Sequence, residues 1–222
     1  KQNPAISMCG SWIEEFSSSG THLGITPFPT THSEIQNKIL YQNVFCHGSI
    51  MARKDDFMRV KGYREEFKHS QDYDLWLRYI ELFKVANLKI PLYRRIISPD
   101  SISFINKEKQ KQYADLARNC YLARKAKTNE PIHLFENISK MESKFKNQKK
   151  IYSGYKFYCG RRLYANGKMR LARKYFFSSL FLNLLALKNI IYIFFTFLPK
   201  NLRMIFEKIW LNGKEKYNLR ID

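Results

Sequence analysis

Two carboxylates, Asp72 and Asp74, are the side chains of this sequence best suited to proton chemistry. Apolar residues follow them at the spacing of one helical face, which predicts a helix from Gln71 to Phe83 with both acids in its first turn. The expected buried face holds Leu75, Trp76, Tyr79, Leu82 and Phe83.

The two acids are expected to differ in role. Asp72 lies three and four residues before Leu75 and Trp76, so it is predicted at the N-terminal edge of the buried face. Asp74 points elsewhere and can pair with Arg78 four residues on. The helix dipole favours an ionised carboxylate in a first turn, and such a carboxylate can accept a proton. Asp72 is therefore a candidate general base, and the alternative is an acid that only starts a helix.

The surrounding sequence resembles that of a known family. Asn43 to Arg78 reads NVFCHGSIMARKDDFMRVKGYREEFKHSQDYDLWLR, and its parts HGSIMAR, KGY and QDYDLWLR are similar to acceptor-side motifs of family 2 glycosyltransferases. These are inverting enzymes with the GT-A fold. The resemblance extends from about Asn3 to Ser103. It implies that Asp72 takes the proton from the acceptor hydroxyl and that Gln71 lies beside the acceptor.

The resemblance implies further site residues. The acceptor pocket is expected to be lined by Trp76, His47, Gly48 and Gly62. A glycine that lets the backbone approach a sugar is one reading of Gly48, and a plain turn is the other.

The chain departs from the family pattern at two places. Lys61 stands where the family has a further glycine, and it could favour an acidic sugar or a phosphate, or simply face water. The family's histidine after its Tyr-Arg is absent near Ile96. Arg94 or Arg95 could contact phosphate instead, or both could be ordinary surface residues of a strand.

One carboxylate suffices for an inverting transfer. The base must lie on the acceptor side, opposite the leaving nucleotide diphosphate. A second carboxylate is not required, because a metal or basic residues can neutralise the leaving group. Asp74 need not be catalytic.

The donor side of such an enzyme is missing from the sequence. The resemblance implies a nucleotide-binding N-terminal βαβ half and a divalent metal (Mn or Mg) held by Asp-x-Asp. Asp72-Tyr73-Asp74 fits the pattern Asp-x-Asp, but it is part of the acceptor-side motif QDYDLWLR, and the sequence has no Gly-rich loop. The four cysteines and five histidines show no metal-ligand spacing. We therefore expect a fragment or truncated product, and a non-catalytic remnant or partner module is an alternative.

The predicted elements of residues 1–105 are those of an α/β domain, interpreted as part of a Rossmann-like GT-A domain. A strand from Asn3 to Ile13 and one from His22 to Thr26 are expected to form a hairpin. A short helix is expected at Glu34–Tyr41, capped by Thr31 or Ser33, and a short helix or a turn at Lys54–Val60. Further strands are expected at Val44–Phe45, Ser49–Ala52, Val85–Ile90 and Leu92–Ile97.

Charge separates the two halves. Residues 1–105 hold 13 lysines and arginines against 11 acids, whereas residues 106–222 hold 26 against 8. The second half requires an anionic partner, either nucleic acid or an anionic lipid surface. It shows no signature of a nucleic-acid-binding fold, so no nucleic acid is expected.

Residues 106–222 are expected to form an all-α extension. The predicted helices are Asn106–Lys127, Ile132–Phe145, Tyr152–Ala165 and Lys168–Phe181, with a lysine-rich bridge at Lys144–Lys150 and the last two helices forming a hairpin.

The run from Tyr175 to Leu198 is almost wholly apolar. Its length matches a membrane span, but Asn183, Lys188 and Asn189 interrupt its centre, where a charge costs ~2.5 to 3.5 kcal/mol. We expect interfacial helices, broken near Lys188 or Pro199, on the cytoplasmic face of a membrane with lysines on anionic headgroups. A buried core helix is the alternative.

Overall fold

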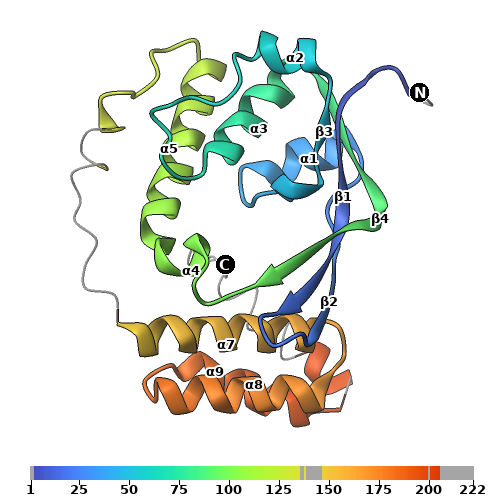
Figure 1. The fold of residues 1–222 in the computed structure, drawn as a ribbon, viewed down its shortest axis with the longest axis vertical. Coiled ribbons are helices and arrows are strands. Elements are labelled where there is room, and N and C mark those ends of the chain that lie inside the picture. The colour runs from blue at the N-terminus through green and yellow to red at the C-terminus, as the bar shows by residue number, and fades with distance from the viewer. Residues whose placement is uncertain (1–2, 136–137, 139–146, 200, 206–222) are drawn as a thin grey trace. The chain divides into compact units, whose positions relative to one another are not determined.

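The chain forms two compact units, Lys1–Asn147 and Gln148–Asp222 (Figure 1). The structure is a computed structural model that describes residues 3–135, 138, 147–199 and 201–205. The first unit is mixed α/β, and the described part of the second is helical, in agreement with the expected α/β domain and helical extension. Most of the expected helix Ile132–Phe145 and the first three residues of the bridge Lys144–Lys150 lie outside the described residues, and the last three residues of the bridge belong to the first helix of the second unit.

The sheet of the first unit is built around β1 (Ile6–Ser17). This strand forms the predicted antiparallel hairpin with β2 (His22–Thr26) and a short antiparallel pair with β3 (Met51–Ala52). On its other edge it pairs in parallel with β4 (Lys84–Ile97) along most of its length. The sheet is therefore mixed, and β2 and β3 share one edge of β1.

Two strand predictions were wrong in detail. Residues 84–97 form one strand rather than two, because β4 continues through Pro91 with register shifts where this residue faces Trp12. The residues around His47 form the 3₁₀ helix η1 (His47–Ser49) rather than part of a strand. There the Ser49 amide and hydroxyl both donate to the Cys46 carbonyl, 2.9 Å away, so turn hydrogen bonds replace a ladder.

Four helices of the first unit begin and end close to the predicted residues, and the short helix α4 (Ile102–Ile105) was not predicted. The four are α1 (His32–Ile39), α2 (Lys54–Arg59), α3 (Gln71–Leu82) and α5 (Lys107–Lys125). At the start of α1, Thr31 and Glu34 form a reciprocal capping box.

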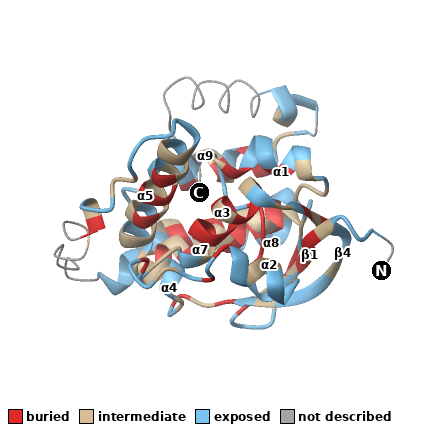
Figure 2. Cartoon of the chain, turned by 90° about the horizontal axis from the view of Figure 1, so that it is seen from above, coloured by how far each residue is buried: buried red, intermediate tan, exposed pale blue. Residues whose placement is uncertain are grey.

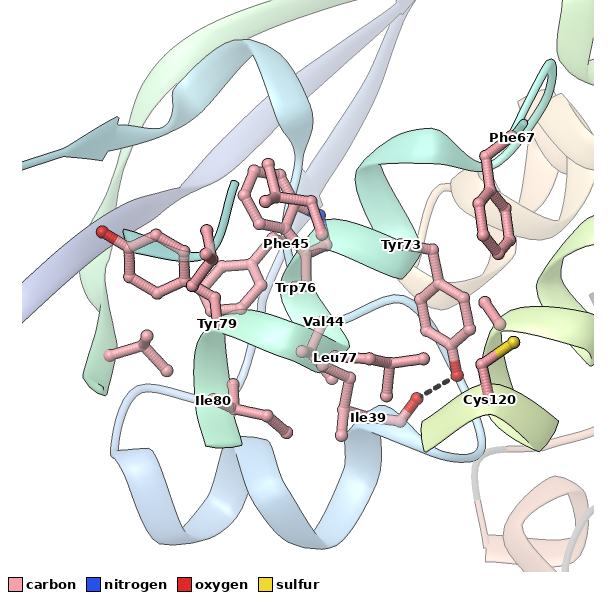
Figure 3. Packing of buried hydrophobic residues seen from close by; sticks show 14 of the residues in the cluster. Ile39, Val44, Phe45, Phe67, Tyr73, Trp76, Leu77, Tyr79, Ile80 and Cys120 are labelled. Atoms are coloured by element: carbon pink, nitrogen blue, oxygen red, sulfur yellow. Dashed lines mark hydrogen bonds between the residues drawn. The ribbon is translucent and has the colours of Figure 1, made fainter. Parts of the chain in front are cut away.

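Helix α3 lies at the centre of the core, but Leu82, predicted on its buried face, is the last residue of the helix and is 62% exposed. Figure 2 shows the helix largely buried, and Figure 3 shows Trp76, Leu77 and Tyr79 packed among side chains of neighbouring elements. The Tyr73 hydroxyl donates to the Ile39 carbonyl at 2.5 Å, which joins α3 to the end of α1.

Helix α5 belongs to the same core, through Tyr113, Leu116, Ala117 and Cys120. The compact unit therefore ends at Asn147 and not at residue 105, where the charge pattern divides the sequence.

The second unit contains α7 (Gln148–Ala165), α8 (Met169–Leu182) and α9 (Leu187–Phe197). The predicted α7–α8 hairpin is present, with Gly167 at a φ of 74° in its turn. The helices approach closely at Gly160, where a Cβ atom would lie 2.6 Å from the Phe176 ring.

The apolar run from Tyr175 is divided at Asn183, before the predicted positions Lys188 and Pro199. The Asn183 amide donates to the Leu180 carbonyl at 3.0 Å and ends α8. Among the residues that the structure describes, no helix is both long enough and apolar enough to cross a membrane.

Candidate active site

The first turn of α3 presents its two acids to different surroundings. Asp74 is fully buried and accepts hydrogen bonds from Arg64 Nε at 3.1 Å and from Arg78 Nε at 2.9 Å. The predicted pair with Arg78 is therefore confirmed. Arg78 also donates to the Gly62 carbonyl at 2.6 Å, so Asp74 holds the loop before α3 through this arginine.

A chain of ion pairs continues from Asp74 to α5. Arg64 pairs with Glu130 at 2.5 Å, and Glu130 pairs with Arg124 at 2.9 Å. Arg124 also binds Glu81, near the end of α3, at 2.6 Å. Burial acts to raise the pKa of Glu130, but hydrogen bonds and charges from the two arginines outweigh it and lower this pKa to about 2. These ion pairs therefore bind α3 near its start, at Asp74, and near its end, at Glu81.

Asp72 is partly exposed and lies outside this network. One carboxylate oxygen accepts the Tyr73 amide at 2.8 Å, and the other accepts Asn43 Nδ2 at 3.4 Å. Burial raises the pKa of Tyr63, and the negative charge of Asp72 raises it further. The Asp72 carboxylate is thus oriented by two donors and retains lone pairs for a further proton.

An aromatic group stands beside Asp72. His47 Nε2 lies 2.7 Å from the Tyr63 hydroxyl, and the two rings meet edge to face with centroids 5.9 Å apart. The His47 ring also lies 6.0 Å from the ring of Trp76, which is 2% exposed. Trp76 Nε1 is buried and has no hydrogen-bond partner among the described residues. The structure therefore brings together three predicted site residues, Asp72, His47 and Trp76, with Tyr63.

The two glycines serve different backbone needs. A Cβ atom at Gly48 would overlap the Tyr93 ring, so this glycine allows β4 to approach η1. Gly62 has a φ of 56° and follows Lys61, which has a φ of 62° and an exposed side chain. Gly62 contributes turn geometry and its carbonyl, and Lys61 faces solvent.

Arg94 lies apart from this group. Its side chain is 78% exposed, pairs with Glu14 on β1 at 3.2 Å and lies over the Phe16 ring. Arg95 points to the opposite side of the strand and binds Glu15, which is fully buried. Burial raises the pKa of Cys46, and the positive charge of Arg95 acts in the opposite direction.

Gln71, the first residue of α3, is exposed next to Asp72. Sequence reasoning did not select Asn43, Tyr63 or Tyr93. The first two lie inside the segment that resembles the family, and Tyr93 lies in the Tyr-Arg pair, so the same motifs could have indicated them. Glu130 lies outside these motifs, so nothing in the sequence indicated its role.

The described residues contain no group of three or more His, Cys, Asp or Glu side chains able to hold a metal ion.

Part of the chain is similar to curated glycosyltransferases. No family model matches the chain. It is 32% identical over 75 residues to the O-antigen biosynthesis glycosyltransferase WbnJ of Escherichia coli. The aligned segment covers 34% of this chain and 29% of that protein. The chain is 41% identical over 63 residues to "Putative glycosyltransferase EpsE" of Bacillus subtilis strain 168. This aligned segment covers 27% of this chain and 22% of that protein. The similarity thus spans less than a third of each relative.

Proposed function

We propose that this chain carries the acceptor side of an inverting glycosyltransferase. The enzyme would move a sugar from a nucleotide-diphosphate sugar to a hydroxyl of a cell-surface glycan or lipid-linked acceptor. The observation that carries the proposal is the contrast within one helical turn: Asp74 is buried in ion pairs, whereas Asp72 is accessible and oriented by Asn43. The partial similarity to glycosyltransferases supports the reaction class.

In this reaction Asp72 is the general base. It accepts the proton of the acceptor hydroxyl while that oxygen bonds to the anomeric carbon of the donor sugar. The bond from that carbon to the diphosphate oxygen breaks, and the electron pair leaves with the nucleoside diphosphate. Attack opposite the leaving group inverts the anomeric configuration.

The aromatic group beside Asp72 is suited to hold the acceptor. The exposed rings of His47 and Tyr63 offer apolar faces with few polar groups, as sugar and ligand pockets require, and the buried Trp76 ring packs against His47. Gln71 and the backbone at Gly48 and Gly62 complete the proposed lining. Arg94 lies away from this group, and the proposal assigns it no step.

The donor side is proposed to come from elsewhere. The complete enzyme is expected to use Mn or Mg, whose ligands would lie outside the described residues, and no step is assigned to the metal. The acceptor class further suggests a peripheral protein on the cytoplasmic face of the membrane.

The test is Asp72→Asn in the complete enzyme. Loss of the base should lower turnover by at least ~100-fold while donor binding is unchanged. Asp55→Asn, at an exposed acid of α2, is the matched control and should retain activity. Normal turnover by Asp72→Asn would exclude Asp72 as the base.

The alternative is a non-catalytic remnant or partner module. Reading the coding DNA upstream of Lys1 separates the two cases. An open frame through a βαβ unit that ends in Asp-x-Asp supports a complete transferase. A nearby stop codon and start site would mean that catalysis needs a partner with the donor site.

A further inference from the structure

The outer face of α8 combines cations with exposed aromatic rings. Arg170, Lys174, Phe177 and Phe181 recur at helical spacing on one face, and all four are exposed, Phe181 by 86%. The buried residues Ala172, Phe176 and Ser179 occupy the opposite face. Helix α8 is therefore packed on one side and apolar on much of the other.

Helix α9 repeats this arrangement. The exposed residues Leu187, Ile190, Phe194 and Phe197 lie on one face, opposite buried residues such as Tyr192. The turn between the helices adds Leu184 and Leu185, the latter 89% exposed. We call the set of exposed apolar residues on these helices and their turn the α8–α9 surface: Phe177, Phe181, Leu184, Leu185, Leu187, Ile190, Phe194 and Phe197.

The two stripes point away from the packed interior of this unit. Tyr192 lies against Phe157 of α7 and Phe176 of α8, with ring centroids 5.4 and 5.2 Å apart. The Ser153 hydroxyl donates to the Ser179 carbonyl at 2.9 Å and joins α7 to α8. Because the inner faces are used in this way, the outer apolar stripes do not contribute to the core. Phe177 and Phe181 line an open hollow with Ser178 and Leu182.

The charged residues of α7, α8 and α9 are all lysines and arginines. The sequence has no acidic residue between Glu142 and Glu207, and it has fourteen lysines and arginines there. Arg173 lies over the Phe197 ring, 4.4 Å from its centroid, and so stands beside the surface. A second copy of this face would bring like charges together. A nucleic acid would use the cations but leave the leucine and phenylalanine side chains in water.

We propose that the α8–α9 surface binds an anionic lipid bilayer and lies in its plane. Phe177 and Phe181 would enter the boundary between headgroups and acyl chains, while Arg170 and Lys174 contact lipid phosphates. The proposal deepens the proposed function, on which it rests for the membrane-linked acceptor. Lipid binding itself needs neither donor nor acceptor, so it fails or succeeds independently of catalysis.

The experiment measures binding of the full chain to phosphatidylcholine vesicles with and without phosphatidylglycerol. Phe177→Ser/Phe181→Ser should lower the partition coefficient on anionic vesicles by about 10-fold or more, because two exposed rings no longer leave water. Arg170→Gln/Lys174→Gln should lower it by about 10-fold on anionic vesicles and have little effect on neutral ones.

Leu82→Ser/Leu92→Ser removes two exposed leucines of the first unit and is the matched control, expected to bind like the original chain. Circular dichroism confirms that each variant folds.

Three outcomes overturn the proposal. The first is that the original chain fails to bind anionic vesicles. The second is that Phe177→Ser/Phe181→Ser binds them like the control. The third is that this variant converts an oligomer into a monomer in light scattering with vesicle binding unchanged, which would identify an interface between copies. Binding to a DNA duplex without any vesicle binding belongs to the first outcome.

Discussion

Asp72 and Asp74 are separated by one residue on α3, yet Asp74 is fully buried between two arginines and Asp72 is partly exposed beside Asn43. Two carboxylates of one helical turn thus carry different tasks. Asp74 secures the helix and the loop before it, and Asp72 is left able to exchange a proton.

Exchanging each acid for its amide separates these tasks. Asp74→Asn should lower the free energy of unfolding of the first unit by about 3 to 5 kcal/mol, because Arg64 and Arg78 lose their buried counter-charge. Asp72→Asn should change it by less than about 0.5 kcal/mol. Urea unfolding followed by tryptophan fluorescence measures both, and equal losses would contradict the division of roles.

The close approach at Gly48 predicts a position intolerant of any side chain. Gly48→Ala should destabilise the first unit by about 1 to 3 kcal/mol, because the new methyl group overlaps the Tyr93 ring. Adding Tyr93→Ala should recover part of the loss by making room. Gly154→Ala is the control, since a Cβ there meets nothing within 4 Å. If Gly48→Ala unfolds at the same denaturant concentration as the original chain, the close approach is wrong.

The left-handed backbone at Lys61 predicts a stabilising change. Lys61→Gly should raise the free energy of unfolding by up to about 1 kcal/mol, because glycine accepts a φ of 62° without a Cβ penalty. Lys61→Ala removes the same exposed side chain but keeps the Cβ atom, so it should bring no gain. The difference between the two midpoints in thermal unfolding is the relevant quantity, and identical midpoints would argue against strain at this residue.

The acid dependence of stability should carry a signature of Glu130. Its pKa is about 2 in the folded state, below the ordinary value of 4.5, so its ion pairs stabilise the fold above about pH 4.5 and lose this effect as pH falls toward 2. Glu130→Gln should therefore lower the free energy of unfolding at neutral pH by about 2 to 3 kcal/mol. The difference in free energy of unfolding between this variant and the original chain should shrink as the pH falls from about 4.5 toward 2.

Chemical unfolding at a series of pH values measures this deficit. Glu65→Gln, at an exposed acid, is the control and should show a small deficit at every pH. A deficit for Glu130→Gln that stays constant down to about pH 2 would mean that the ion pairs do not lower this pKa.

Local signals in the sequence were sufficient for much of the first unit. The β1–β2 hairpin, the capping box at Thr31 and the pair of Asp74 with Arg78 were predicted because each depends on residues within a few positions of one another. The position of Asp72 at the start of α3 followed from the same helical periodicity.

Features that join distant residues escaped prediction. The strand through Pro91 continues because β1, about eighty residues earlier, supplies a partner along its length. The approach of Gly48 to Tyr93 and the link from Arg64 to Glu130 likewise depend on how separate elements pack. Periodicity within a segment carries no information on such pairings.

Ser70 immediately precedes α3 in a left-handed conformation, with a φ of 55°, and its hydroxyl donates to the Gln110 carbonyl of α5 at 2.9 Å. A hydrogen bond thus joins the residue before α3 to α5, forty residues further along the chain. A chain cut after Ile105 would keep every motif that resembles a glycosyltransferase and still lose this hydrogen bond, along with the ion pair between Arg124 and Glu81. The part of the chain that holds α3 in place therefore reaches through α5, into the part of the sequence where no motif was recognised.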